Sequence, residues 1–459
     1  MKRCLGALVA ILAVFGVALM AAGTASAAKK GNEPLVVCKF GCKYKTIQKA
    51  VDKSGKNATI LIEPGKYKEG VIVEGKKHNG LTIAGDTKNA KKVILEGKNA
   101  KSEDGLAQNG IEAIDVKGIT IKNLTARNYA TNGIFIRDSN LADGDKSLDC
   151  DDYLVKNTFT SYNRAYGVYA FGCVSGRMTK STGVGHGDSA FYVGATPPTK
   201  GKPKWTVLDK LDAHTNIQAF SGTNSRYIEI KDSNFYNNGS GVVPNTLDSE
   251  PYEPATIGKI HDNNIFWNNY NYYLPDSKVQ TISNGLGQLG DQTINFPTGV
   301  GVVLFGTTGW EVYDNEIFGH FKWGAAVFSD AVGNEGNDAE STNNSFVDNQ
   351  MGRGGTDTNA VDFFNDGSGS GNCFQGNTSS TFDPSGSATN GNLYPTCPAP
   401  APPASGTGSS AGDAQQFGDL AGYVLTTPPS DQECSWTKHS HPPFMDYKPD
   451  EVAGANCSD

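Results

Sequence analysis

Six aspartates in residues 138–153 are the first residues of this sequence that suggest chemistry. The stretch reads DSNLADGDKSLDCDDY. Clustered carboxylates suit Ca²⁺, because this hard cation takes six to eight oxygen ligands. Asp143, Asp145 and Asp149 are therefore candidate calcium ligands, although their spacing is not that of an EF-hand. The alternative is a solvated acidic loop tethered by Cys150.

The elements that must position this loop are short strands that recur along the chain. One pattern recurs in four stretches, 119–139, 153–171, 227–244 and 310–328. It consists of a short apolar strand, an Asn or Asp, another strand and an apolar triplet that begins with Gly. A fixed period of about 22 to 25 residues is typical of a stacked solenoid. The repeated units are β-branched and aromatic and lack ten-residue amphipathic stretches, so the sequence predicts a solenoid of strands.

Three short strands separated by turns in about 23 residues resemble the right-handed parallel β-helix of pectate-lyase-like proteins, from about residue 44 to residue 397. The resemblance implies an all-β fold, a single-stranded right-handed parallel β-helix whose coils stack about 4.8 Å apart. A short polar side chain at a turn can take a left-handed backbone conformation and bond to the neighbouring coil. We expect this structural role for Asn123, Asn157, Asp232, Asn263 and Asn315.

The segment 185–188, Gly-His-Gly-Asp, resembles a motif of β-helical polygalacturonases, in which the histidine assists acids that hydrolyse the substrate by single displacement. Such an enzyme needs an acid and a base about 6.5 to 9.5 Å apart, a gap that stacked coils can supply. The resemblance makes Asp151, Asp152, His186 and Asp188 candidate catalytic residues. However, no N-T-D or R-I-K string accompanies them, and His186 precedes an inward strand where a structural residue would suffice.

A lyase is the second catalytic possibility. In β-helix lyases a bound Ca²⁺ neutralises a uronate carboxylate, which is the role that the acidic loop would serve. Arg177 follows Asp152 by 25 residues, about one coil, so it could lie over this acid as a lyase-type base or as its salt-bridge partner. The longer motifs of pectate lyases, pectin methylesterases and alginate epimerases are absent from the sequence.

Cysteine spacing matches the coil length. Cys4 lies in a predicted signal peptide, which leaves eight cysteines, an even number typical of disulfides in an exported protein. Equivalent positions of neighbouring coils lie about 5 Å apart, within the Cα range that a disulfide requires. Spacings of 23 and 24 residues therefore predict the first two of four pairs: Cys150–Cys173, Cys373–Cys397, Cys38–Cys42 and Cys434–Cys457.

Composition divides the chain into four parts. Residues 1–28 carry a basic start, an apolar run and an A-S-A cleavage site, so they predict a signal peptide and a secreted or extracytoplasmic protein. Residues 29–397 form the β-helix domain, and TIQKAVDKS at 46–54 predicts a short amphipathic helix over its first coil. A Pro/Ala/Gly/Ser linker at 398–413 and a disulfide-stapled tail at 414–459 follow.

Charge and hydropathy exclude several partners. The net charge is −8, and removal of Lys2 and Arg3 gives −8 − 2 = −10 for the mature chain. An acidic protein without a basic stripe is a poor nucleic-acid binder. No second apolar run is long enough for a transmembrane segment. We expect a monomer.

Two functions remain open, because a fold does not fix a function. The first is an exported protein that binds an extended polysaccharide and cleaves an acidic glycan as a lyase or hydrolase. The second is a non-catalytic cell-surface or envelope protein that uses the solenoid as a binding rod or a spacer. Beside these two, an accessory role in enzyme maturation is a third alternative.

Exposed aromatic rings would help to separate these functions, because a row of them would indicate a sugar-stacking platform. The candidates are Tyr162, Tyr166, Trp267, Tyr270, Tyr272 and Tyr273. The stretch 274–299 lacks the repeated phrase and is expected to be an excursion from one coil, with no regular inward-facing strand at 276–296.

Overall fold

The computed structural model describes residues 33–98, 101–102, 105–141, 148–270, 298–330, 340–353, 357–367, 369–378, 381–383 and 394–398. The predicted signal peptide, the tail with Cys434 and Cys457, and the linker after its first residue lie outside these ranges. Residues 274–297 of the predicted excursion also lie outside them, as do Tyr272, Tyr273, Asp143 and Asp145.

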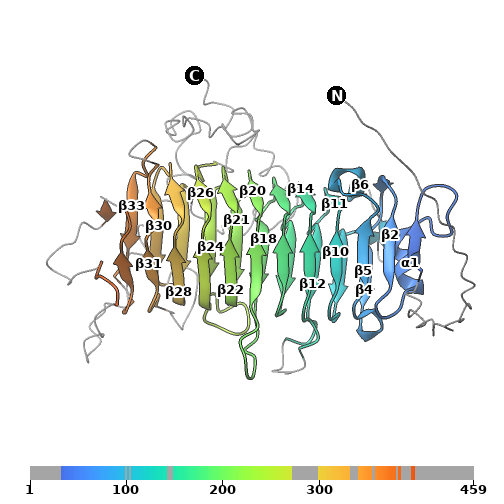
Figure 1. The fold of residues 1–459 in the computed structure, drawn as a ribbon, viewed down its shortest axis with the longest axis horizontal. Helices are drawn as coiled ribbons and strands as arrows, with labels where there is room; N and C mark the ends of the chain where they lie inside the picture. Colours follow the sequence, from blue (N-terminus) through green and yellow to red (C-terminus); the bar gives the residue numbers. More distant parts are fainter. Residues whose placement is uncertain are drawn as a thin grey trace, which may run out of the picture. The chain divides into compact units, whose positions relative to one another are not determined.

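Three parallel sheets build the described part of the chain, and strands of successive coils lie side by side in each (Figure 1). Sheet 1 contains β1 (Leu35–Val37), β2 (Thr59–Ile62), β5 (Thr82–Gly85), β10 (Thr120–Lys122), β13 (Leu154–Lys156), β16 (Arg177–Thr179), β19 (Thr206–Asp209), β22 (Arg226–Lys231), β25 (Thr256–His261), β28 (Thr308–Tyr313), β31 (Ser345–Val347) and β34 (Cys373–Gln375). Sheet 2 contains β3 (Gly65–Tyr67), β6 (Val93–Glu96), β11 (Thr125–Arg127), β14 (Phe159–Ser161), β17 (Thr182–Val184), β20 (Asp212–His214), β23 (Asn234–Tyr236), β26 (Asn264–Phe266), β29 (Glu316–Phe318) and β32 (Gln350–Met351).

Sheet 3 contains β4 (Val71–Glu74), β9 (Ile111–Ile114), β12 (Ile134–Arg137), β15 (Val168–Phe171), β18 (Ser189–Gly194), β21 (Gln218–Thr223), β24 (Ser240–Asn245), β27 (Val300–Phe305), β30 (Trp323–Phe328), β33 (Val361–Asn365) and β35 (Phe382–Asp383). Outside these sheets, β7 (Lys101–Ser102) and β8 (Gly105–Leu106) form an antiparallel pair, and η1 (Lys76–His78) and η2 (Ala90–Lys92) are single 3-10 turns. The chain visits sheets 1, 2 and 3 in turn, for example through β10, β11 and β12, before it starts the next coil. The protein is therefore a right-handed parallel β-helix, as the resemblance implied.

The core follows from the alternation of side chains along each strand. In sheet 1, one inward row passes through successive strands in register, and every member is fully buried: Ile121, Val155, Met178, Leu208, Ile230, Ile260, Val312 and Phe346. Because side chains point to opposite faces with a period of two, the I-x-I phrases of the sequence supply this row.

The turns between sheets 1 and 2 use left-handed residues. Asn123, Asn157 and Asp232 have φ of 60°, 52° and 49°, and Asn157 Nδ2 donates to Asn123 Oδ1 in the preceding coil at 2.8 Å. The predicted turn role of these three residues is confirmed.

Two of the five turn predictions were placed one residue late. In the later coils the left-handed residues are Asp262 and Asp314, with φ of 53° and 52°. Asn263 and Asn315 follow them and are buried, and Asn263 Nδ2 donates to Asn315 Oδ1 at 3.0 Å. These amides bond to the neighbouring coil as expected, but from the position after the bend.

A helix covers the N-terminal end of the stack. The predicted helix is α1 (Ile47–Lys53), which buries Ile47, Ala50 and Val51 and lies beside β2 and β4 (Figure 1). Thr46 caps it by accepting the backbone N–H of Lys49 at 3.3 Å. The helix therefore shields the edge that the first coil would otherwise expose.

Three of the four predicted disulfides are present. The Cα atoms are 4.8 Å apart for Cys150–Cys173, 5.0 Å for Cys373–Cys397 and 5.9 Å for Cys38–Cys42. The first two bonds join neighbouring coils, which confirms the coil length read from the sequence. Their presence is compatible with an extracytoplasmic location. Within the described ranges, no helix is long and apolar enough to cross a membrane.

Candidate functional site

The acidic loop contributes one described candidate metal ligand, Asp149. Its carboxylate pairs with the ammonium groups of Lys76 and Lys117 at 3.3 and 3.7 Å, and its backbone N–H donates to Asp138 at 3.0 Å. Across the residues that the structure describes, no cluster of three His, Cys, Asp or Glu side chains could hold a metal ion. The calcium site stays a prediction, since Asp143 and Asp145 are outside the described ranges.

Asp151 and Asp152 do not join the other candidates. Asp151 pairs with Lys204, and Asp152 is an exposed turn residue with φ of 59°. Arg177 does not lie over Asp152, because the register places it opposite Leu154 in β13. Its guanidinium instead makes a two-pronged ion pair with Asp209, at 2.9 and 3.0 Å. The interpretation of Arg177 as the partner of Asp152 was therefore wrong.

His186 lies in a buried polar ladder. Its Nδ1 accepts the backbone N–H of Asn163 at 3.3 Å, and its own backbone N–H donates to Asn216 Oδ1 at 2.9 Å. Asparagines hold the same position in other coils, for example Asn238, whose Oδ1 accepts the N–H of Asn216 at 3.1 Å. His186 is 0% exposed, and burial lowers its pKa to about 3. This neutral, enclosed imidazole has a structural role.

Asp188 belongs to a different environment, in which its charge also acts on a second acid, Glu250, that sequence analysis missed. Its carboxylate accepts the Ser189 hydroxyl at 2.7 Å and also hydrogen-bonds Tyr166, while burial raises its pKa to about 6. Glu250 accepts the Tyr192 hydroxyl at both oxygens, at 2.7 and 2.9 Å. Burial raises the pKa of Glu250 to about 7, and the negative charge of Asp188 adds to the rise. We call Asp188 and Glu250 the acid pair.

The tyrosines of the acid pair continue into a row of rings on the outer face of sheet 3. Tyr166 and Tyr192 have ring centroids 4.9 Å apart, and both contact Tyr169, at 4.5 and 4.7 Å. Tyr169 stacks on Phe135 of the preceding coil, with centroids 4.4 Å apart and planes 11° apart. Phe135, Tyr166 and Tyr169 are half-buried, whereas Tyr192 is buried. We call these four residues the aromatic platform.

A charged rim borders the platform on the side of the earlier coils. Arg137 Nε donates to Glu112 at 2.9 Å, and the guanidinium carbon lies 5.8 Å from the Phe135 ring centroid. Asn109 Nδ2 also donates to Glu112, at 2.9 Å. Arg137 therefore places a guanidinium, paired with Glu112, beside the half-buried rings.

Of the rings proposed from sequence that fall in the described ranges, only Tyr166 lies on this platform. Tyr162 is half-buried at a separate left-handed turn, and Trp267 and Tyr270 are buried. The signal that could have found Phe135 and Tyr169 is their place in the Gly-led strands GIFIR and GVYAF. The second residue after the glycine must face outward if its neighbours face the core.

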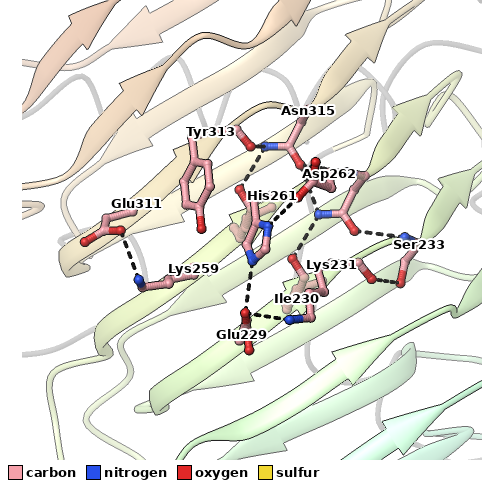
Figure 2. A network of polar contacts seen from close by, with 12 residues as sticks. Glu229, Ile230, Lys231, Ser233, Lys259, His261, Asp262, Glu311, Tyr313 and Asn315 are labelled. Atoms are coloured by element: carbon pink, nitrogen blue, oxygen red, sulfur yellow. Dashed lines mark hydrogen bonds and ion pairs between the residues drawn. The ribbon is translucent and has the colours of Figure 1, made fainter.

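A network of ion pairs covers another face, the outer side of sheet 1 (Figure 2). His261 lies between two carboxylates, with Nε2 3.1 Å from Glu229 and Nδ1 2.7 Å from Asp262. Its ring stacks on Tyr313, with centroids 4.6 Å apart, and Lys231 Nζ bonds Glu229 at 2.9 Å. Both ring nitrogens are engaged, so this histidine is held in place by its neighbours.

Comparisons with known proteins found solved structures of low similarity. No family model matches the chain, and no curated protein matches it. Among solved structures, the A-module of the Azotobacter vinelandii mannuronan C-5 epimerase AlgE4 is 13% identical with a TM-score of 0.46, covering 76% of this chain and 92% of that one. A rhamnogalacturonan lyase is 10% identical with a TM-score of 0.46, covering 71% and 84%. An alginate lyase from Paenibacillus is 12% identical with a TM-score of 0.39, covering 76% and 94%. These values carry no argument about function.

Proposed function

We propose that this protein is exported, binds an extended acidic polysaccharide on the aromatic platform and cleaves it with the acid pair. The observation that carries the proposal is the position of Asp188 and Glu250. Two carboxyl groups with raised pKa values lie at the end of a row of half-buried rings. Perturbed acids beside a binding surface are the usual mark of acid–base catalysis.

Binding would use the rings and the arginine at the rim. Phe135 and Tyr169 belong to successive coils, so their rings repeat along the stack and can each contact the apolar face of a sugar. Arg137 gives its Nε–H to Glu112, so its long-range charge is largely balanced. Its terminal amino groups would donate short-range hydrogen bonds to the carboxylates and hydroxyls of an acidic glycan.

The acid pair would divide the work of proton transfer. Glu250 has the higher pKa, about 7, so it is about half protonated at pH 7 and is the better proton donor, whereas Asp188, at about 6, is mostly ionised there. Hydrolysis of a glycosidic bond requires a protonated acid and an ionised carboxylate that flank the bond. Because each charge affects the other, the two pKa values belong to the pair. The tyrosine hydroxyls hold both carboxyl groups in place.

The test is a cleavage assay with a panel of acidic and neutral polysaccharides, with Ca²⁺ or with a chelator. New reducing ends without an unsaturated product indicate a hydrolase, and ultraviolet absorbance of an unsaturated uronate indicates a lyase. Glu250→Gln and Asp188→Asn should each reduce turnover by about 10²-fold or more while binding is retained. Tyr169→Ala should weaken binding.

Asp152→Asn is the matched control, because this exposed acid lies outside the pair. It should leave turnover unchanged. Glycan binding without cleavage in the unmodified protein would overturn the catalytic part and favour the non-catalytic function. A calcium requirement would support the predicted site in the acidic loop, and full activity in the chelator would oppose it.

A further inference from the structure

A second group of side chains lies where strands of sheet 1 begin. Trp205 directly precedes β19, and Tyr227 and Ile257 are the second residues of β22 and β25. The rings of Trp205 and Tyr227 meet edge to face, with centroids 5.7 Å apart, and both side chains are half-buried. Ile257 is 40% exposed, which is unusual for a large apolar side chain in the described part of the molecule.

Two of these residues have an unfavourable backbone. Tyr227 and Ile257 have φ of 55° and 57°, and the parallel pairing of β22 with β25 skips both. The left-handed region is costly for residues with a side chain, and above all for a β-branched one. In the next coil the same position is Gly309, with φ of 69°, so glycine meets the backbone requirement there. Tyr227 and Ile257 thus keep their side chains at a position where glycine would cost less. Such backbone strain points to a function of the side chain.

The polar groups beside these residues are already paired. Lys259 Nζ lies 5.7 Å from the Trp205 ring centroid and 3.5 Å from a Glu311 carboxylate oxygen. Lys231 Nζ is 2.9 Å from Glu229 (Figure 2). Because each cation has an anion within 3.5 Å, this face offers little net field to a charged ligand, but its polar groups can still exchange hydrogen bonds with hydroxyls.

We propose that this face is a second carbohydrate-binding site, selective for a neutral polysaccharide strand. Trp205 and Tyr227 stack on the sugar rings, Ile257 extends the apolar contact along the stack, and Lys259, Glu229 and Glu311 bond the hydroxyl groups. The site differs from the aromatic platform in its sheet and in the charge of its ligand, so each can fail without the other.

The test is calorimetric titration of the full-length protein with cellohexaose, mannohexaose and xylohexaose, and with hexagalacturonate and hexamannuronate. We expect at least one neutral oligosaccharide to bind. Trp205→Ala should weaken that binding at least about tenfold, about 1.4 kcal/mol, and leave acidic oligosaccharides unaffected. Tyr169→Ala should leave the neutral oligosaccharide unaffected. Phe40→Ala is the matched control, because Phe40 is an aromatic residue 89% exposed elsewhere.

Ile257→Asn separates binding from stability. Asn tolerates the left-handed backbone better than Ile does, so the variant should melt at the same temperature or higher and yet bind the neutral oligosaccharide more weakly. The proposal is overturned if none of the three neutral oligosaccharides binds, if Trp205→Ala binds them as the unmodified protein does, or if the Trp205-dependent ligand is acidic.

Discussion

The imidazole of His186 accepts the backbone N–H of Asn163, with 3.3 Å between the two nitrogens, and so stands where other coils use an asparagine. At this position of the coil, an imidazole nitrogen in His186 and an amide oxygen in Asn238 accept the same kind of backbone N–H bond from the neighbouring coil. The residue that most resembled a catalytic histidine is thereby a component of the scaffold, and its replacement is open to direct test.

His186→Asn should preserve the fold and the proposed cleavage, because Asn restores the ladder acceptor. His186→Ala should lower the free energy of unfolding by about 1 to 3 kcal/mol, since the N–H of Asn163 loses its partner. Chemical denaturation measures both. Loss of turnover in well-folded His186→Asn would contradict the structural role.

The same histidine should make stability depend on pH. Its pKa is about 3 in the fold against an ordinary value of 6.5, because burial opposes the charged form. The unfolded chain therefore takes up a proton first, and the contribution of His186 to stability is complete above about pH 6.5 and is lost as the pH falls toward 3. His186→Asn should reduce this slope in denaturation curves taken across that range.

Glu250 should act in the opposite direction. Its pKa is about 7 in the fold against 4.5 ordinarily, chiefly through burial. Its contribution is therefore present at low pH and is lost as the pH rises from about 4.5 through 7. At pH 8 the free energy of unfolding of Glu250→Gln should exceed that of the unmodified protein by about 1 to 3 kcal/mol. Chemical denaturation measures the difference. An unchanged pH dependence would show that this carboxyl is not held in its protonated form.

Arg177 should matter for stability and not for cleavage. Asp209 has a side chain only 2% exposed, and although burial opposes its ionisation, hydrogen bonds from Arg177 and Thr179 lower its pKa overall. Arg177→Met would leave this carboxylate without its main partner and should cost about 1 to 3 kcal/mol. Arg177→Met with Asp209→Asn should recover part of that loss. A defect in turnover with normal stability would restore Arg177 as a catalytic candidate.

The Cys150–Cys173 bond should stabilise the coil that carries the acidic loop. Replacing both cysteines by alanine should cost about 2 to 4 kcal/mol, and non-reducing peptide mapping of the unmodified protein should recover the two residues in one linked fragment. Cys38→Ala with Cys42→Ala is the natural comparison, because that bond closes a loop of only a few residues and should contribute less. Equal losses for the two pairs would contradict the expectation.

Sequence reasoning succeeded where a regular spacing decided the outcome. The coil length predicted the strand solenoid and two disulfides between neighbouring coils, and the helical spacing of Ile47, Ala50 and Val51 predicted the helix over the first coil. It failed where either of two adjacent polar residues could take the left-handed conformation, as at Asp262 and Asn263. A period of about 23 residues locates the turn but does not show which residue bends the backbone.

The candidate site was harder to predict than the fold. Glu250 lies between β24 and β25, in a segment without the repeated phrase, so nothing in the sequence links it to Asp188. Arg177 could pair forward or backward along the stack, and its spacing from Asp152 favoured the wrong neighbour. Spacing in the sequence gives the coil of a residue but not the direction in which a long side chain reaches.

The capped first coil also gives the molecule a direction of assembly. Glu69, at the turn into β4, accepts the N–H groups of Ile47 and Gln48 at 3.0 and 3.1 Å, which ties the helix to the first complete turn of the chain. Because each coil contacts only its neighbours, further coils can add only on the side away from the helix. The same covered end also closes the stack to strands of other molecules on that side.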